Sequence, residues 1–259
     1  MKITFLGTGN SQGIPIIGSK HPVCLSKNPK DQRLRSSVLI EKKKKFFLID
    51  CGPDFRYQML RSNHTRLDGI LITHEHYDHI GGLEDIRPIN VNMNNRSIPV
   101  YGLRRVLENI KKRFFYIFSS NSKKKTNIAN VSIHEIDHYK NFFLLEHFKI
   151  FPLSIWHGAL SILGFRIDNF AYITDANNIP IKTIQQLKNL DLLVLNVLRK
   201  KPKHPSHFTL FESLNIIDKI SPKKTYLTHI SHMLGFHEKI EKELPKNVHL
   251  AYDGLTINP

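Results

Sequence analysis

The sequence predicts an α/β protein that folds as a four-layer αββα sandwich. The chain has two halves in which short apolar runs, typical of buried strands, are followed by amphipathic segments, typical of helices. Histidine or aspartate side chains stand directly after several of the apolar runs. Two β-rich halves with helices outside would pack sheet against sheet, and these polar side chains would then meet at one edge of both sheets.

The first half contains five expected strands, at residues 2–6, 35–41, 45–50, 69–73 and 97–101. A glycine-rich turn follows the first strand at residues 7–13, and the second and third strands form a hairpin with a lysine-rich tip. Helices are expected at residues 53–61, 83–89 and 102–116. A polar run over residues 119–130 reads as the loop between the two halves.

The second half repeats this order of elements, although no repeat is visible at the level of single residues. Strands are expected at residues 131–136, 148–153, 163–167, 170–174, 191–197 and 224–228, with a last strand near 248–251. Helices are expected at residues 179–190 and 209–220. The length suits one large domain or two small ones and allows roughly three quarters of the unfolded surface to be buried. We expect one domain over residues 1–259.

The composition indicates a water-soluble cytoplasmic protein. A hydrophobic fraction of 41% and a charged fraction of 23% are ordinary for a globular domain. No segment approaches the ~20 consecutive apolar residues that span a bilayer, and the apolar start of the chain is too short for a signal peptide. The two cysteines, Cys24 and Cys51, are far apart and do not resemble a disulfide framework.

The strongly basic balance, with a formal net charge of +16, raises the question of an RNA partner. Lysine, asparagine and isoleucine are abundant throughout the chain, so we favour a compositional origin for the charge. The lysine runs at 42–45 and 123–125 are typical of a hairpin tip and a solvated loop. RNA binding therefore stays open but is not favoured, and the sequence leaves open whether the chain forms a homodimer.

The most informative motif is H-x-H-x-D-H, which directly follows the apolar strand at residues 69–73. It offers His74, His76, Asp78 and His79 as metal ligands. Two imidazoles at i and i+2, with an Asp-His pair just after them, do not all suit one tetrahedral ion. The spacing therefore indicates two metal ions, one held by the first pair and one by the second.

This motif resembles the signature of the metallo-β-lactamase-fold hydrolases, and the resemblance covers nearly the whole chain. It implies three later ligands, His157, Asp175 and His229, each of which follows or ends a short apolar run. By the resemblance, one Zn²⁺ is held by His74, His76 and His157 and a second by Asp78, His79 and His229, with Asp175 bridging them and Mn²⁺ as an alternative metal. An aspartate at the bridging position is similar to the branches that cleave phosphodiesters or thioesters.

The same resemblance raises the question of a third, structural Zn²⁺. In the most similar phosphodiesterases, a G-C-x-C-x-x-C stretch supplies three thiolates, and a histidine shortly after the last catalytic ligand completes the site. Here Ser19 replaces the first cysteine and His21 the second. The residues His21, Cys24 and His232 would then hold zinc as a mixed nitrogen and sulfur set. Both a weakened zinc site and a metal-free loop stay open.

The resemblance also implies a non-ligand histidine at His207, which stands immediately before the helix expected at residues 209–220. A cationic imidazole there would stabilise charge on phosphorus and protonate the leaving alkoxide, while Asp78 orients the attacking water. The neighbouring His204, between two prolines, is interpreted as a loop residue. Asp50 is interpreted either as a hydrogen-bond acceptor for a ligating histidine or as a helix cap.

The branch that the chain resembles most is the cyclic phosphodiesterase associated with carbon-phosphorus lyase. We therefore expect a phosphodiesterase for a small cyclic or nucleotide-like substrate. One alternative is a tRNA 3′-end processing endonuclease, but that family carries a long tRNA-binding arm between its third histidine ligand and its bridging aspartate. Only eighteen residues separate His157 from Asp175. A further alternative is a non-catalytic metal-binding member of the same fold.

Overall fold

The computed structural model describes residues 1–119, 128–137 and 140–258, whose strands form two sheets of seven strands each. The first sheet runs in the order β14 (Thr256–Ile257), β1 (Lys2–Gly7), β2 (Ser37–Lys42), β3 (Lys45–Ile49), β4 (Gly69–Leu71), β5 (Ile98–Gly102) and β6 (Val131–Glu135). The second runs in the order β13 (Val248–Leu250), β12 (Lys224–Thr228), β11 (Leu192–Asn196), β10 (Phe170–Ile173), β9 (Leu160–Ile167), β8 (Phe148–His157) and β7 (Phe143–Leu145). Residues 120–127, which include the lysine run at 123–125, lie outside the described residues.

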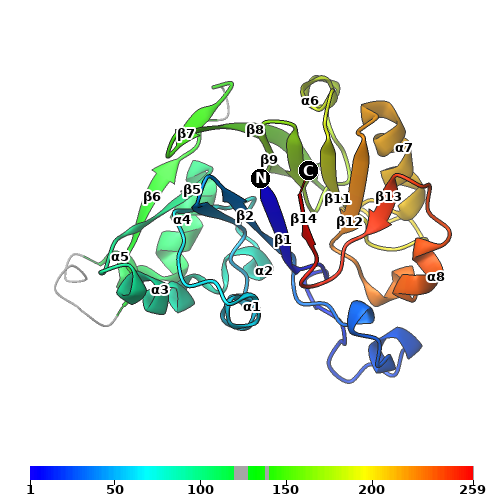
Figure 1. Ribbon diagram of the computed structural model, residues 1–259, viewed down its shortest axis with the longest axis horizontal. Coiled ribbons are helices and arrows are strands. Elements are labelled where there is room, and N and C mark those ends of the chain that lie inside the picture. The colour runs from blue at the N-terminus through cyan, green and yellow to red at the C-terminus, as the bar shows by residue number, and fades with distance from the viewer. Residues whose placement is uncertain (120–127, 138–139, 259) are drawn as a thin grey trace.

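The helices lie on the two outer faces, as Figure 1 shows. The first sheet carries α1 (Phe55–Ser62), α2 (Tyr77–Ile80), α3 (Arg87–Asn92), α4 (Arg104–Arg113) and α5 (Phe115–Phe118), with the 3₁₀ turns η1 (Pro22–Leu25), η2 (Pro29–Asp31) and η3 (Leu83–Ile86) in the same half of the chain. The second sheet carries α6 (Ile181–Gln186), α7 (Leu210–Ile220) and α8 (His237–Glu241), with the 3₁₀ turn η5 (His232–Leu234).

Three large apolar clusters hold these layers together. The central cluster lies between the two sheets and includes Phe5 and Phe47 from the first sheet and Phe165 and Tyr172 from the second. A second cluster packs the helices on the first sheet, and a third packs α7 and α8 on the second. This arrangement of helix, sheet, sheet and helix confirms the predicted four-layer sandwich.

The local chemistry explains several elements. The expected hairpin is formed by β2 and β3, and its tip residues Lys43 and Lys44 have positive φ angles of 48° and 63°. Positive φ at both central residues matches the twist that two-residue hairpin loops require. The helix α7 begins at a capping box, in which Thr209 and Glu212 satisfy each other's backbone N–H groups.

The segment after the H-x-H-x-D-H motif differs from the prediction. Instead of one helix over residues 83–89, the chain forms α2, η3 and α3 in succession. Gly82, which lies between α2 and η3, packs so closely against Gly52 that a Cβ there would lie 2.2 Å from the carbonyl oxygen of Gly52. A new helix begins at Arg87 because Pro88 fits the first turn of a helix but not its interior. The helix predicted at residues 179–190 is also shorter, and the short strands β7 and β14 and the helix α8 were not predicted.

The strand directions place the polar chain segments at one edge of the molecule. The strands β3, β4, β5 and β6 run parallel to one another in the first sheet, as do β10, β11, β12 and β13 in the second. The carboxyl ends of parallel strands lie at the same edge of a sheet. Among the described residues, no helix is both long enough and apolar enough to cross a membrane.

Candidate metal centre

The structure brings the seven predicted ligands into two neighbouring groups. The first group is His74, His76 and His157, and the second is Asp78, His79, Asp175 and His229. Within each group, one nitrogen or oxygen atom from every side chain lies within 4.8 Å of the others. These residues follow β4, β10 and β12 or end β8, so the folding of both sheets is needed to assemble them.

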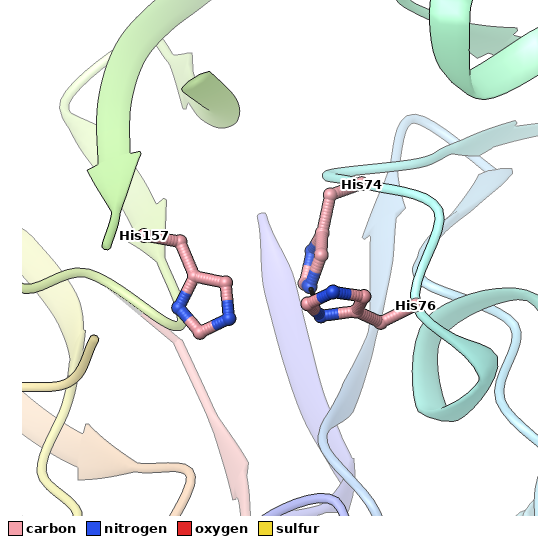
Figure 2. A group of neighbouring side chains, drawn as sticks. All are labelled: His74, His76 and His157. Carbon is pink, nitrogen blue, oxygen red and sulfur yellow. Dashed lines mark hydrogen bonds between the residues drawn. The ribbon is translucent and has the colours of Figure 1, made fainter. Parts of the chain in front are cut away.

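The first group joins the two halves of the chain (Figure 2). His74 and His76 come from the segment after β4, and His157 ends β8 on the opposite side. The Nε2 atom of His74 lies 2.9 Å from Nδ1 of His76. His157 Nδ1 donates to the backbone oxygen of Asp175 at 2.8 Å, which leaves its Nε2 atom for a ligand.

The second group is almost fully buried and is centred on Asp175. One oxygen of this carboxylate, Oδ1, lies 3.1 Å from Nε2 of His229, and the other, Oδ2, lies 3.4 Å from Nε2 of His79. Asp78 Oδ2 lies 3.0 Å from the same nitrogen of His79. The carboxylate of Asp175 therefore faces both imidazoles of this group.

Asp50 orients His79, as the first of its two interpretations predicted. His79 Nδ1 donates to Asp50 Oδ2 at 2.7 Å. Asp50 also accepts hydrogen bonds from the backbone N–H and the hydroxyl of Thr73, the residue before the motif. Among the described residues Asp50 makes no side-chain capping bond to a helix, and its carboxylate instead ties β3 to the segment that carries His74 and His79.

Three strand ends at the centre adopt left-handed backbone conformations. The φ angles are 64° at Asp50, 57° at Asp175 and 57° at His229. Aspartate and histidine tolerate this region better than most residues with a Cβ, but it remains sparsely populated. Such conformations are found preferentially where a surrounding structure holds functional side chains in place.

The protein groups alone already have the charges expected of a cation site. Burial would raise the pKa of Asp175, but His229 and His79 beside it hold that pKa well below its usual value. Burial lowers the pKa of His74 well below its usual value and that of His229 to about 4. Ionised carboxylates and neutral imidazoles are the forms that bind metals.

His79 differs from the other histidines of the centre, and its surroundings test whether these residues suit a metal ion. Burial alone would lower its pKa, but the carboxylates of Asp78, Asp50 and Asp175 raise it well above the usual value. Its Nε2 atom is buried and has no hydrogen-bond partner among the described residues. A cation between this nitrogen and the two carboxylates would satisfy all three groups, so the residues fit a metal.

The structure places His207 beside the second group. Its Nε2 atom lies 3.1 Å from Asp175 Oδ1, and its Nδ1 atom lies 3.1 Å from Nδ1 of His204. His204, which was interpreted as a loop residue, is therefore in direct contact with the predicted proton donor. His207 also forms a third possible ligand group with His157 and Asp175, so its position allows either a metal-binding or a proton-donating role.

The predicted structural zinc site receives only partial support from the geometry. The rings of His21 and His232 lie against each other with centroids 4.8 Å apart, and Nδ1 of His232 is buried without a hydrogen-bond partner among the described residues. However, His21, Cys24 and His232 are not among the described groups whose ligand atoms lie within 4.8 Å of one another. The structure therefore does not assemble these three residues as a metal site.

The sequence did not indicate one ion pair at the centre. Glu75, which stands between His74 and His76, is held by Arg105 of α4 through bonds of 2.7 and 3.1 Å. Arg105 also donates to the backbone oxygen of Ser161 at 2.8 Å. The only sequence signal was the position of Glu75 inside the motif, because Arg105 is thirty residues away along the chain.

Comparison with known proteins identifies the family. A family model described as a beta-lactamase superfamily domain matches residues 45–230. The chain belongs to this superfamily. Its structure is similar to the crystal structure of a diphosphatase from the PhnP family, with 39% identity, a TM-score of 0.91 and coverage of 99% of this chain and 97% of that one. This similarity confirms the expected resemblance to the metallo-β-lactamase fold.

Two curated relatives align with different shares of this chain. An octanoyltransferase of Porphyromonas gingivalis is 38% identical over 98% of this chain, and the match covers 51% of that protein. A ribonuclease Z of Prochlorococcus marinus is 31% identical over 58% of this chain, covering 43% of that protein. The chain thus spans about half the length, or less, of these two relatives.

Proposed function

We propose that the chain is a metal-dependent phosphodiesterase that acts on a small cyclic or nucleotide-like phosphodiester. The observation that carries this proposal is the pair of adjoining ligand groups with His207 against the carboxylate between them. The similarity to a diphosphatase of the PhnP family supports chemistry at a phosphorus centre.

In this proposal His74, His76 and His157 would hold one cation, Asp78, His79 and His229 would hold a second, and Asp175 would contribute its carboxylate to both. Zinc suits this set of nitrogen and oxygen ligands, and Mn²⁺ is the alternative. When bound, the two cations would supply an attacking water of lowered pKa and offset the negative charge of the phosphate.

The chain's own residues position this chemistry. Asp50 holds His79 so that Nε2 faces the ligand group, and the backbone oxygen of Asp175 does the same for His157 through its Nδ1 proton. His207 is placed to donate the proton of its Nε2 atom to the leaving oxygen, with His204 on its other ring nitrogen. Asp78 orients the attacking water through its carboxylate.

A tRNA 3′-end processing endonuclease is the second candidate, favoured by the net charge of +16 and by the ribonuclease Z relatives. The chain between His157 and Asp175 weighs against it. The strands β9 and β10 occupy residues 160–167 and 170–173, which leaves no room there for an RNA-binding arm. A non-catalytic metal-binding role is the third candidate, and the position of His207 weighs against that role.

The experiment is a hydrolysis assay with the purified chain, loaded with Zn²⁺ or with Mn²⁺, on bis(4-nitrophenyl) phosphate and on a 2′,3′-cyclic nucleotide. We expect cleavage that EDTA abolishes and metal restores. A folded, metal-loaded protein that cleaves neither ester would contradict the proposal. Salt-sensitive binding of a precursor tRNA with cleavage at its 3′ trailer would favour the endonuclease instead.

A further inference from the structure

His204 contacts the ring nitrogen of His207 that does not face the metal centre. Nε2 of His207 lies 3.1 Å from Oδ1 of Asp175, and Nδ1 of the same ring lies 3.1 Å from Nδ1 of His204. The centroids of the two rings are 4.9 Å apart. His204 is not in any of the groups of close ligand atoms found among the described residues. Any effect of His204 on the reaction is therefore exerted through His207.

The backbone of Ser206 shows which of these two nitrogens carries a proton. The N–H group of Ser206 donates to Nδ1 of His204 at 3.3 Å. Because a backbone N–H can only donate, Nδ1 of His204 is an acceptor and has no proton. Two nitrogen lone pairs 3.1 Å apart would repel each other, so Nδ1 of His207 carries a proton that points to His204. The hydroxyl of Ser206 lies 3.2 Å from Nδ1 of His207 and 3.3 Å from Nδ1 of His204, where it can accept from the first and donate to the second.

The loop that carries both histidines is held against the segment of Asp175. The side-chain amide of Asn177 donates to the backbone oxygen of Pro205 at 2.7 Å. The backbone N–H of Phe208 donates to the oxygen of Ala176 at 2.8 Å. These bonds involve no histidine side chain, so replacing one of the two histidines leaves the loop in place.

Two other imidazoles fix the orientation of the His207 ring. The ring of His229 stacks on it, with centroids 5.0 Å apart and an interplanar angle of 14°. The ring of His157 meets it edge-on, with centroids 4.7 Å apart. Only 13% of the side chain of His207 is exposed. The ring is thus held with Nε2 towards Asp175 and with Nδ1 towards His204.

The surroundings of His204 suit a hydrogen-bond acceptor. Burial, followed by the charges of His207 and Arg199, lowers the pKa of His204. Arg199 is held in the same loop by its bond of 2.9 Å to the backbone oxygen of Pro202. A neutral imidazole offers one nitrogen as an acceptor, and the bond from Ser206 shows that here it is Nδ1.

We propose that His204 is a positioning residue for the proton donor: its Nδ1 accepts the Nδ1 proton of His207, so that Nε2 is the nitrogen that releases a proton. The inference rests on the proposed phosphodiesterase function and adds a residue to the same site. In the reaction, the bond between phosphorus and the leaving oxygen breaks, and the Nε2 proton of the cationic His207 goes to that oxygen. His207 is then neutral, and the bond to His204 retains its remaining proton on Nδ1.

The test compares two phosphodiesters whose leaving groups differ in their need for a proton. A 2′,3′-cyclic nucleotide releases an alkoxide, which must be protonated, whereas bis(4-nitrophenyl) phosphate releases a stabilised phenolate. We expect His204→Leu to lower the kcat for the cyclic nucleotide roughly tenfold, which is part of the factor that general-acid catalysis contributes. The kcat for bis(4-nitrophenyl) phosphate and both KM values should stay within about twofold.

His204→Asn is the matched control, because asparagine and leucine have nearly the same shape but only asparagine offers an acceptor oxygen. This variant should keep the kcat of the wild-type chain for the cyclic nucleotide. Adding His204→Leu to His207→Ala should lower the kcat no further, because His204 acts through His207. An equal fall for both esters, equal kcat values for the leucine and asparagine variants, or a further loss in the double variant would overturn the proposed role.

Nitrogen-15 NMR of the zinc-loaded protein tests the same hydrogen bond without turnover. At a pH where His207 is neutral, we expect its proton on Nδ1 in the wild-type chain and in His204→Asn, and partly on Nε2 in His204→Leu. If the wild-type chain cleaves neither ester, the proposed function fails and this measurement alone decides the role of His204. A neutral His207 with its proton on Nε2 in the wild-type chain would contradict the inference.

Discussion

Asp50 and His79 form the hydrogen bond on which the geometry of the second ligand group depends. Nδ1 of His79 donates to Asp50 Oδ2 at 2.7 Å, so Nε2 of the same ring faces Asp78 and Asp175. Because a bond to one ring nitrogen fixes which atom can bind a metal, Asp50 would act on a cation at this group through His79.

Replacing Asp50 by asparagine should weaken this orientation without changing the size of the side chain. We expect Asp50→Asn to lower the affinity of the second ligand group for a cation by about 10- to 100-fold. The affinity of the first ligand group for its cation should not change. Competition with a metal chelator measures both affinities. Asp168→Asn is the control, since Asp168 pairs with Lys42 at an exposed position. Unchanged affinities in Asp50→Asn would remove Asp50 from the metal centre.

His207 should contribute to turnover and not to metal binding. His207→Ala removes the proton donor that lies 3.1 Å from Asp175, so we expect the kcat to fall by a factor of about 100 or more. The metal content should stay the same, and His249→Ala, at the far strand β13, should leave both values unchanged. An unaltered kcat would exclude the proton-donating role, and a lost metal equivalent would instead assign His207 as a ligand.

Gly52 should be needed for the position of the metal-binding segment. A Cβ at this residue would lie 2.1 Å from the carbonyl oxygen of Asp78, so Gly52→Ala must displace the backbone that carries Asp78 and His79. We expect a loss of about 1–3 kcal/mol in the free energy of unfolding, together with weaker metal binding. Gly102→Ala is the matched control, because its nearest neighbour would be 3.4 Å away. Equal denaturation midpoints for the two variants would contradict this account.

His237 should make the fold less stable in acid. Burial, followed by the charge of Arg33, lowers the pKa of His237 to about 4, and Nδ1 of His237 lies 3.0 Å from Arg33. An unfolded histidine has a pKa of about 6.5, so between pH 6.5 and 4 the unfolded chain binds more protons than the folded chain. Stability therefore falls as the pH falls through this window.

The variant His237→Asn keeps a hydrogen-bond acceptor for Arg33 but does not titrate. The difference in melting temperature between pH 7 and pH 5 should be smaller for His237→Asn than for the wild-type chain. The remaining difference comes from other buried groups with lowered pKa values, such as His229. A difference as large as that of the wild type would show that His237 does not contribute to the acid sensitivity.

The four layers and the seven candidate ligands could be predicted from the sequence because their signals are local. Each strand is an apolar run of its own, and His157, Asp175 and His229 stand at or just after the ends of such runs. The H-x-H-x-D-H motif is also a local signal, because its residues are consecutive in the chain. Their assignment to two sets followed from the resemblance to a known family, and the structure places the two sets side by side.

The features that were not predicted depend on contacts between distant segments. The pairing of Glu75 with Arg105 requires α4 to pack beside the motif, and the close approach of Gly82 to Gly52 joins segments that are thirty residues apart in the chain. Neither contact leaves a periodic signal in the sequence. The residues around Cys24 resemble a zinc-binding motif in sequence. In the structure, however, His21, Cys24 and His232 do not form one of the close groups of ligand atoms found among the described residues.

The metal content of the chain tests the central claim most directly. Elemental analysis should be done on the Cys24→Ser variant, which removes any contribution from a structural site, after reloading and dialysis. We predict two metal equivalents per chain, and at most one when Asp175→Ala is added, because in the proposed arrangement both cations would share that carboxylate. A folded Cys24→Ser protein that retains fewer than two equivalents would contradict the account.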